Sequence, residues 1–198
     1  MSDKQLPQLT RRRLLMAGAS ASALFLPVPY AWVWAQSSNG LKLLRTPKVA
    51  LVIGNGKYQH SPLANPANDA RGMAAALQEV GFSVTSGLEL TQAAMREAIQ
   101  AFSENLAQSK AVGLFYFAGH GAQLAWRNYL VPVDAQIADI NELRERAVDL
   151  NSLIDGIRKA GNPMNVIILD ACRDNPFGST ARADQKGLSQ LDAPPGTF

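Results

Sequence analysis

The run AVGLFYFAGHG, residues 111–121, is the most apolar part of the chain after its first 35 residues. Residues 111–118 carry no charge and predict a buried central strand that gives way to a loop at Gly119-His120-Gly121. Three other segments have the composition of strands: KVALVIG (48–54), FSVT (82–85) and NVIIL (165–169). The sequence therefore predicts four main strands.

Helices are predicted between these strands, because apolar residues recur there at helical spacing. The first is expected to be capped by Asn68 or Asp69 and to run to Val80, with Gly81 as its stop. The second spans Thr91 to about Gln108. The third spans 150–160 with Asn151 as a candidate cap. The residues expected on the buried faces are Met73, Leu77 and Val80 in the first helix and Met95, Ile99, Phe102 and Leu106 in the second.

Strands that alternate with helices predict an α/β fold, with a mostly parallel sheet, helices on both faces and right-handed crossovers. Residues 128–133 are expected to form a small hairpin arm. In such sheets, reactive groups lie at the carboxyl ends of the strands. His120, Cys172 and the loop that carries Asn65 to Asp69 are therefore expected at one edge of the sheet.

The single cysteine, Cys172, follows the last apolar run and lies 52 positions after His120. A thiol is only slightly ionised near neutral pH and needs a neighbouring base, which His120 can supply before it protonates a leaving amine. The amides of Gly121 and Cys172 can face a developing oxyanion. A lone cysteine is more often a small buried apolar residue, and Gly-His-Gly alone is more often a turn. Together, at adjacent strand ends, they favour a catalytic pair.

Other kinds of site are disfavoured. Gly54-Asn55-Gly56 lacks the third glycine of a dinucleotide site, and the chain has no phosphate loop and no Gly-x-Ser-x-Gly elbow. Two histidines and one cysteine make a poor metal-ligand set, so we predict no metal and no cofactor. His60 is expected to face solvent. One cysteine also excludes an intrachain disulfide.

The net charge of +3 comes from the beginning of the chain. Residues 1–35 carry four basic side chains and one acidic side chain, which leaves 15 of each for the other 163 residues. The body therefore has no charge excess that would indicate nucleic-acid binding. TRRRLL (10–15) precedes an uncharged stretch up to Ala35 and resembles a twin-arginine export signal, with cleavage before Gln36.

This leader predicts a periplasmic or exported protein, with residues 36–47 as a polar linker to the body. The alternative is a membrane anchor formed by an uncleaved leader, since the uncharged stretch is barely long enough to span a bilayer. Pro27 and Pro29 weaken that alternative, because proline interrupts a helix. No other membrane contact is predicted.

Four motifs follow one another from about Lys48 onward: ALVIGN (50–55) with Tyr58, LANPANDA (63–70), YFAGHG (116–121) and DACRDNPF (170–177). In these motifs the chain resembles bacterial caspase-like cysteine peptidases of the metacaspase and orthocaspase branch. Ala-Cys-Arg at 171–173 also matches the centre of the caspase signature Gln-Ala-Cys-[Arg/Gln/Gly]-Gly, whose histidine lies about 50 residues upstream. The resemblance implies a caspase-like three-layer sandwich and an endopeptidase of protein or peptide substrates, with His120 and Cys172 as its dyad.

Specificity is predicted from the departures from animal caspases. They have glutamine where this chain has Asp170, and an arginine in the loop after the first strand, where this chain offers only Lys57. The resemblance maps the acidic pocket of metacaspases onto Asp69 and Asp170, which implies cleavage after arginine or lysine through charge pairing. The alternative role for Asp69 is a helix cap.

The chain ends at PPGTF (194–198), about where caspase-like folds continue with two further strands. We therefore expect the domain, 48–198, to lack its last strands and to leave the cysteine strand as an uncovered apolar edge. It is then a fragment, a truncated product or a large subunit that needs a partner chain to supply strands. A catalytically inactive binding or scaffold module is the alternative function.

Arg182 and Lys186 lie in a small and polar stretch after the cysteine and are candidates for self-cleavage. A plain solvated loop is the alternative interpretation. Calcium dependence is left open by the sequence.

Overall fold

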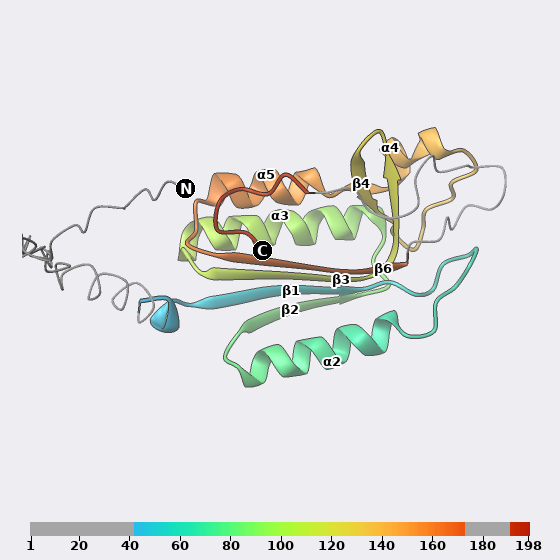
Figure 1. Ribbon diagram of the computed structural model, residues 1–198. Coiled ribbons are helices and arrows are strands. Elements are labelled where there is room, and N and C mark those ends of the chain that lie inside the picture. Colours follow the sequence, from blue (N-terminus) through green and yellow to red (C-terminus); the bar gives the residue numbers. More distant parts are fainter. Residues whose placement is uncertain (1–41, 173–190) are drawn as a thin grey trace, which may run out of the picture. The chain divides into compact units, whose positions relative to one another are not determined.

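The computed structural model describes residues 42–172 and 191–198 (Figure 1). Strands and helices alternate along them, which confirms the predicted α/β class. The predicted leader lies outside the described residues, and 42–45, within the predicted linker, form a helical turn. The elements are β1 (Lys48–Gly54), α2 (Pro66–Glu79), β2 (Ser83–Leu88), α3 (Gln92–Ser109), β3 (Val112–Leu124), β4 (Arg127–Leu130), the 3-10 helix η1 (Ile140–Glu142), α4 (Leu143–Arg146), β5 (Val148–Asp149), α5 (Asn151–Ala160) and β6 (Asn165–Cys172).

The main sheet has β3 at its centre, as predicted. β1 pairs in parallel with β2 and with β3, and β3 pairs in parallel with β6. Beyond His120, β3 continues to Leu124 and pairs antiparallel with β4, which pairs antiparallel with β5. The expected hairpin arm is confirmed, and the sheet is mixed rather than wholly parallel.

The placement of His120 in a loop after the central strand was wrong. The residue lies inside β3, because β4 supplies a hydrogen-bonding partner for the stretch from Gly121 to Leu124. The hairpin turns at Ala125 and Trp126, whose φ angles are 49° and 63°, and two positive φ angles are typical of a two-residue hairpin turn.

Helices cover both faces of the sheet, as predicted. Figure 1 shows α3 and α5 on one face and α2 on the other. On the first face, Leu51, Ile53, Phe115 and Phe117 pack with both helices. On the second face, Val52, Leu114 and Tyr116 pack with α2. Because side chains alternate along a strand, residues of β3 with even numbers face α2. The four predicted core residues of α3 are all buried: Met95, Ile99, Phe102 and Leu106.

Helix α2 begins earlier than predicted. It starts at Pro66, which suits the first helical position because its fixed φ is helical and its missing N–H has no partner there anyway. The N-cap is Asn65, so the assignment of the cap to Asn68 or Asp69 was wrong. Val80 is also not on the buried face: it follows the last helical residue and is 62% exposed.

Helix α5 is capped differently from the prediction too. Its N-cap is Leu150, and Asn151 is its first residue, whose amide donates to the Asp149 carboxylate at 2.9 Å. The Asp149 carboxylate, just before the helix, therefore satisfies one of the free amides at the start of α5.

The edge of β6 is not wholly uncovered, which corrects the expectation for the cysteine strand. Thr197 forms a parallel bridge with Asn165. The Asn165 amide donates to Gly196 O at 2.8 Å, and the Ile167 amide donates to Phe198 O at 2.7 Å. The final residues thus pair with the first part of β6. In the part of the chain that the structure describes, no strand pairs with this edge beyond Ile167.

Candidate active site

His120 is held at its backbone by Tyr58, which lies in the loop after β1. The Tyr58 hydroxyl accepts from the His120 amide at 2.9 Å and donates to Val131 O at 3.2 Å. The two rings lie 4.4 Å apart between centroids, with an angle of 43° between their planes. His120 is 4% exposed. One tyrosine thus fixes both the strand position and the ring face of the histidine.

The imidazole has a second partner in the same loop, the carbonyl of Ser61, whose oxygen lies 2.7 Å from Nε2. A carbonyl oxygen only accepts hydrogen bonds, so Nε2 carries the hydrogen. In the neutral ring, Nδ1 is therefore the basic nitrogen. Ser61 itself has a φ of 55°, an uncommon conformation for a residue with a side chain.

Asn55 ties the start of this loop to the rest of the fold. Its amide donates to Ala118 O at 2.9 Å, and its side-chain oxygen accepts from the Leu90 amide at 2.9 Å. Its side-chain nitrogen lies 3.2 Å from Leu90 O and 3.4 Å from Val131 O. The side chain is fully buried. The end of β1 is thus bonded to the segment before α3 and to the segment after β4.

Cys172 is the last residue of β6, and its register partner on β3 is His120. The prediction that the two residues lie on adjacent strands is confirmed at the level of the backbone, although only Cys172 ends its strand. Gly121 pairs with Leu130 of β4, and the Val131 amide donates to His120 O at 3.0 Å. In an antiparallel ladder this makes Gly121 and Leu130 a non-hydrogen-bonded pair, so the Gly121 N–H faces the edge of β3 along which β6 runs.

The two predicted pocket carboxylates lie near the same tyrosine. The Tyr116 hydroxyl donates to Asp170 Oδ2 at 3.2 Å. Burial raises the pKa of Tyr116 to about 12, assisted by the charge and hydrogen bond of Asp170 and by the charge of Asp69. Both aspartates are exposed, and Asp69 lies in the first turn of α2. Two negative charges therefore converge on the face of the sheet that carries His120.

The sequence interpretation gave no role to Tyr58, Ser61 or Asn55. Tyr58 and Asn55 belong to the first of the four motifs, which marks them as candidate functional residues. Their hydrogen-bonding partners are distant in the sequence, so their roles could not be predicted from it. Ser61 acts through a backbone carbonyl, which no residue type reveals.

Several residues named in the sequence analysis are not part of this site. Arg182 and Lys186 are outside the described residues. His60 and Lys57 are exposed, as expected for His60. Across residues 42–172 and 191–198, no three His, Cys, Asp or Glu side chains cluster as a metal site would require. No helix in the same ranges has the length and apolar character needed to span a bilayer.

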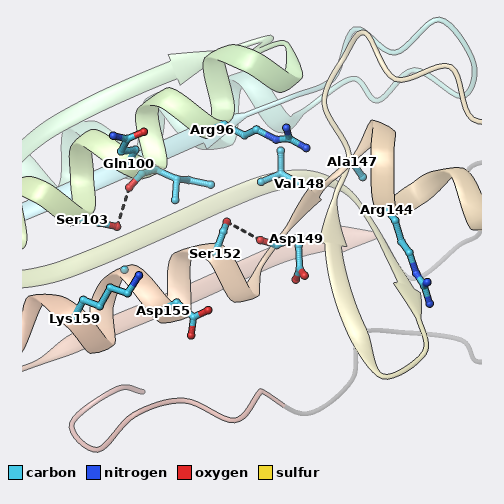
Figure 2. Close-up of a pocket in the computed structure, with 12 residues that line it drawn as sticks. Arg96, Gln100, Ser103, Arg144, Ala147, Val148, Asp149, Ser152, Asp155 and Lys159 are labelled. Atoms are coloured by element: carbon cyan, nitrogen blue, oxygen red, sulfur yellow. Dashed lines mark hydrogen bonds between the residues drawn. The ribbon is translucent and has the colours of Figure 1, made fainter.

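A groove of about 520 Å³ lies between α3, α5 and the segment that leads into β5 (Figure 2). None of its twelve lining residues is a predicted site residue. Asp149 and Asp155 in its lining pair with Arg127 and Arg158 at 2.6 and 2.5 Å. Its carboxylates are interleaved with the basic side chains Arg96, Arg144 and Lys159, so the lining does not select one sign of charge.

Comparison with known proteins adds a family. Residues 47–195 match the family described as Caspase domain. The chain is 36% identical over 129 residues to human mucosa-associated lymphoid tissue lymphoma translocation protein 1 and, over the same length, to its mouse homolog. The aligned part is 64% of this chain and 15% of each relative, so the chain spans a small part of these proteins.

Proposed function

Because this chain belongs to the caspase-domain family, a family of cysteine peptidases, we propose that it is a cysteine endopeptidase with His120 and Cys172 as its dyad. The observation that carries the proposal is the register of β3 and β6, which pairs these two residues at the carboxyl edge of the sheet. Catalytic groups of open α/β sheets lie at this edge.

The tautomer of His120 supports a role as general base. With Nε2 donating to Ser61 O, Nδ1 takes the proton of the Cys172 thiol as the sulfur attacks the substrate carbonyl carbon. The imidazolium then gives a proton to the leaving amine, and water hydrolyses the thioester. The Ser61 carbonyl accepts a hydrogen bond from Nε2 both when the ring is neutral and when it is the imidazolium. The bond is stronger in the charged form, so it stabilises the imidazolium.

The negative charge that develops on the carbonyl oxygen needs fixed donors. We propose the amides of Gly121 and Cys172 for this role. The direction of the Gly121 N–H, toward the β6 side of β3, supports its part in the proposal.

We propose arginine or lysine as the residue before the cleaved bond, as the resemblance to the metacaspase branch implies. The support is the approach of Asp170 and Asp69 to Tyr116 on the α2 face of the sheet. Hydrogen bonds to charged groups contribute about 1.5–3 kcal/mol, so loss of one carboxylate should lower kcat/KM by about 10-fold to 100-fold.

The proposal is tested with fluorogenic peptides that end in Arg, Lys or Asp, using the full chain. Cleavage of the basic peptides should vanish in His120→Ala and in Cys172→Ala. His60→Ala is the matched control, because it removes the other histidine of the chain from an exposed position. Asp170→Asn should lose activity on basic peptides. Preference for the Asp peptide would contradict the pocket, and activity in Cys172→Ala would contradict the dyad.

The alternative, an inactive binding or scaffold module, predicts no turnover of any of these peptides. It also predicts capture of a partner chain that extends the sheet along the outer edge of β6. Self-cleavage after Arg182 or Lys186 follows from the proposed specificity, and intact mass after incubation, compared with Cys172→Ala, tests it.

We also propose export by the twin-arginine route, supported by Arg11, Arg12 and Arg13 ahead of the uncharged stretch. Replacing these arginines with lysines should keep the protein in the cytoplasm of a bacterial host. Unchanged periplasmic recovery would contradict the proposal.

A further inference from the structure

We propose that Glu89 is a positioning residue for His120, acting through the loop that carries Tyr58 and Ser61. This inference rests on the proposed function, since it assigns the loop to the proposed catalytic histidine.

Glu89 directly follows β2 and is bonded at three points to the end of β1 and the start of the loop after it. Its amide donates to Gly54 O at 2.9 Å. Its carboxylate oxygen Oε2 accepts from the amides of Gly56 and Lys57, each at 2.8 Å. One side chain therefore satisfies two successive amides at the start of the loop. Hydrogen bonds to an ionised acceptor are shorter and stronger than neutral ones.

The backbone of Glu89 is held in an unfavourable conformation to make these contacts. Its φ is 56°, in the left-handed region, which is less favourable than the ordinary helical region for a residue with a side chain. Glycine would adopt this conformation without that cost. The position nevertheless carries a glutamate, whose carboxylate makes the two hydrogen bonds to the loop.

From the two amides, the loop leads directly to His120. Gly56 O accepts from the amides of Tyr58 and Leu63, both at 2.9 Å, which closes the loop on itself. Inside this closed loop lie the two groups that hold the histidine, the Tyr58 hydroxyl and the Ser61 carbonyl. Loss of the Glu89 carboxylate would release the start of the loop, and both contacts to His120 would lose their fixed position.

The chain offers variants that separate positioning from stability. Glu89→Gly removes the acceptor and also relieves the backbone, so the two effects on stability oppose each other. Glu89→Gln keeps the length and one acceptor oxygen but removes the charge. Ala125→Gly is the matched control: Ala125 has a φ of 49°, is exposed at the hairpin turn, and is not among the residues assigned to the site.

The experiment measures kcat and KM on a basic fluorogenic peptide, the unfolding midpoint, and the imidazole nitrogen NMR shifts of the full chain. Only two histidines are present, so His60→Ala assigns the His120 signals. We expect Glu89→Gly to lower kcat at least tenfold with KM within twofold, and to replace the Nε2–H signature by an average of tautomers. Ala125→Gly should leave kcat and the signature unchanged, and Glu89→Gln should be intermediate.

An unchanged kcat and an unchanged Nε2–H signature in Glu89→Gly would overturn the proposal, as would a change confined to KM. If that variant does not fold, Glu89→Gln decides by the same two readouts. If the wild-type chain cleaves no peptide, the proposed function fails, and the NMR signature alone decides whether Glu89 positions the histidine.

Discussion

Replacing Tyr58 with phenylalanine removes one hydroxyl and leaves the ring against His120. That hydroxyl is the acceptor for the His120 amide and the donor to Val131 O. Tyr58 is 6% exposed, so water reaches neither group easily. A buried amide that loses its acceptor costs about 1–3 kcal/mol. We therefore expect Tyr58→Phe to lower the free energy of unfolding by about 2 kcal/mol.

Urea unfolding measures this loss, and the thermal midpoint should fall by about 6 °C for a chain of this size. The matched control is Tyr129→Phe. Tyr129 is 3% exposed, but no hydrogen bond is made by its hydroxyl among the described residues, so the loss should stay under about 0.5 kcal/mol.

The same variant should slow catalysis, because the histidine loses its backbone anchor. We expect kcat on a basic peptide to fall by about 10-fold to 100-fold, since small misplacements of a catalytic group have effects of that size. A stability within 0.3 kcal/mol of the wild type, on the order of measurement error, together with an unchanged kcat, would refute the reasoning that Tyr58 holds His120.

Two further predictions concern the same strand. A Cβ at Gly119 would lie 2.6 Å from the Tyr58 hydroxyl and 2.8 Å from Phe117 Cζ, so Gly119→Ala should cost about 1–3 kcal/mol in urea unfolding, and an unchanged midpoint would contradict this packing. Tyr116, with a pKa raised from 10.0 to about 12, keeps its proton when folded at a pH where the unfolded chain has lost it. Stability is therefore fully present below pH 10 and declines by roughly 3 kcal/mol toward pH 12. Tyr116→Phe should abolish that part of the decline, and an identical alkaline profile in the variant would count against the environment described for Tyr116.

The elements with a strong local pattern were predictable. The buried stripe of α3 follows from its helical spacing alone, and all four of its residues are in the core. β1 has the predicted bounds, because a short apolar run closed by glycine has few other ways to be buried. Val80 fits the same spacing in α2 but falls after the last turn, and helix ends are set by capping groups rather than by periodicity.

What the sequence did not predict depends on contacts between distant segments. The extension of β3 past His120 requires β4 as a partner. The pairing of Thr197 with Asn165 joins residues that no local pattern connects. Within the site, Glu89 interacts with amides about 30 positions earlier, and its acidic side chain after a strand has no distinctive sequence context. The histidine and the cysteine could be proposed from the sequence because a thiol–imidazole pair requires those two residue types.

The central claim is tested most directly by covalent labelling of Cys172. A peptidyl acyloxymethyl ketone that ends in arginine is attacked by the thiolate, which displaces the carboxylate and leaves a stable thioether. The account predicts that mass spectrometry finds this adduct on Cys172 in the full chain, that labelling is lost in His120→Ala and retained in His60→Ala, and that Asp170→Asn slows it. Labelling that is faster with the aspartate analogue, or equal in His120→Ala, would contradict the account.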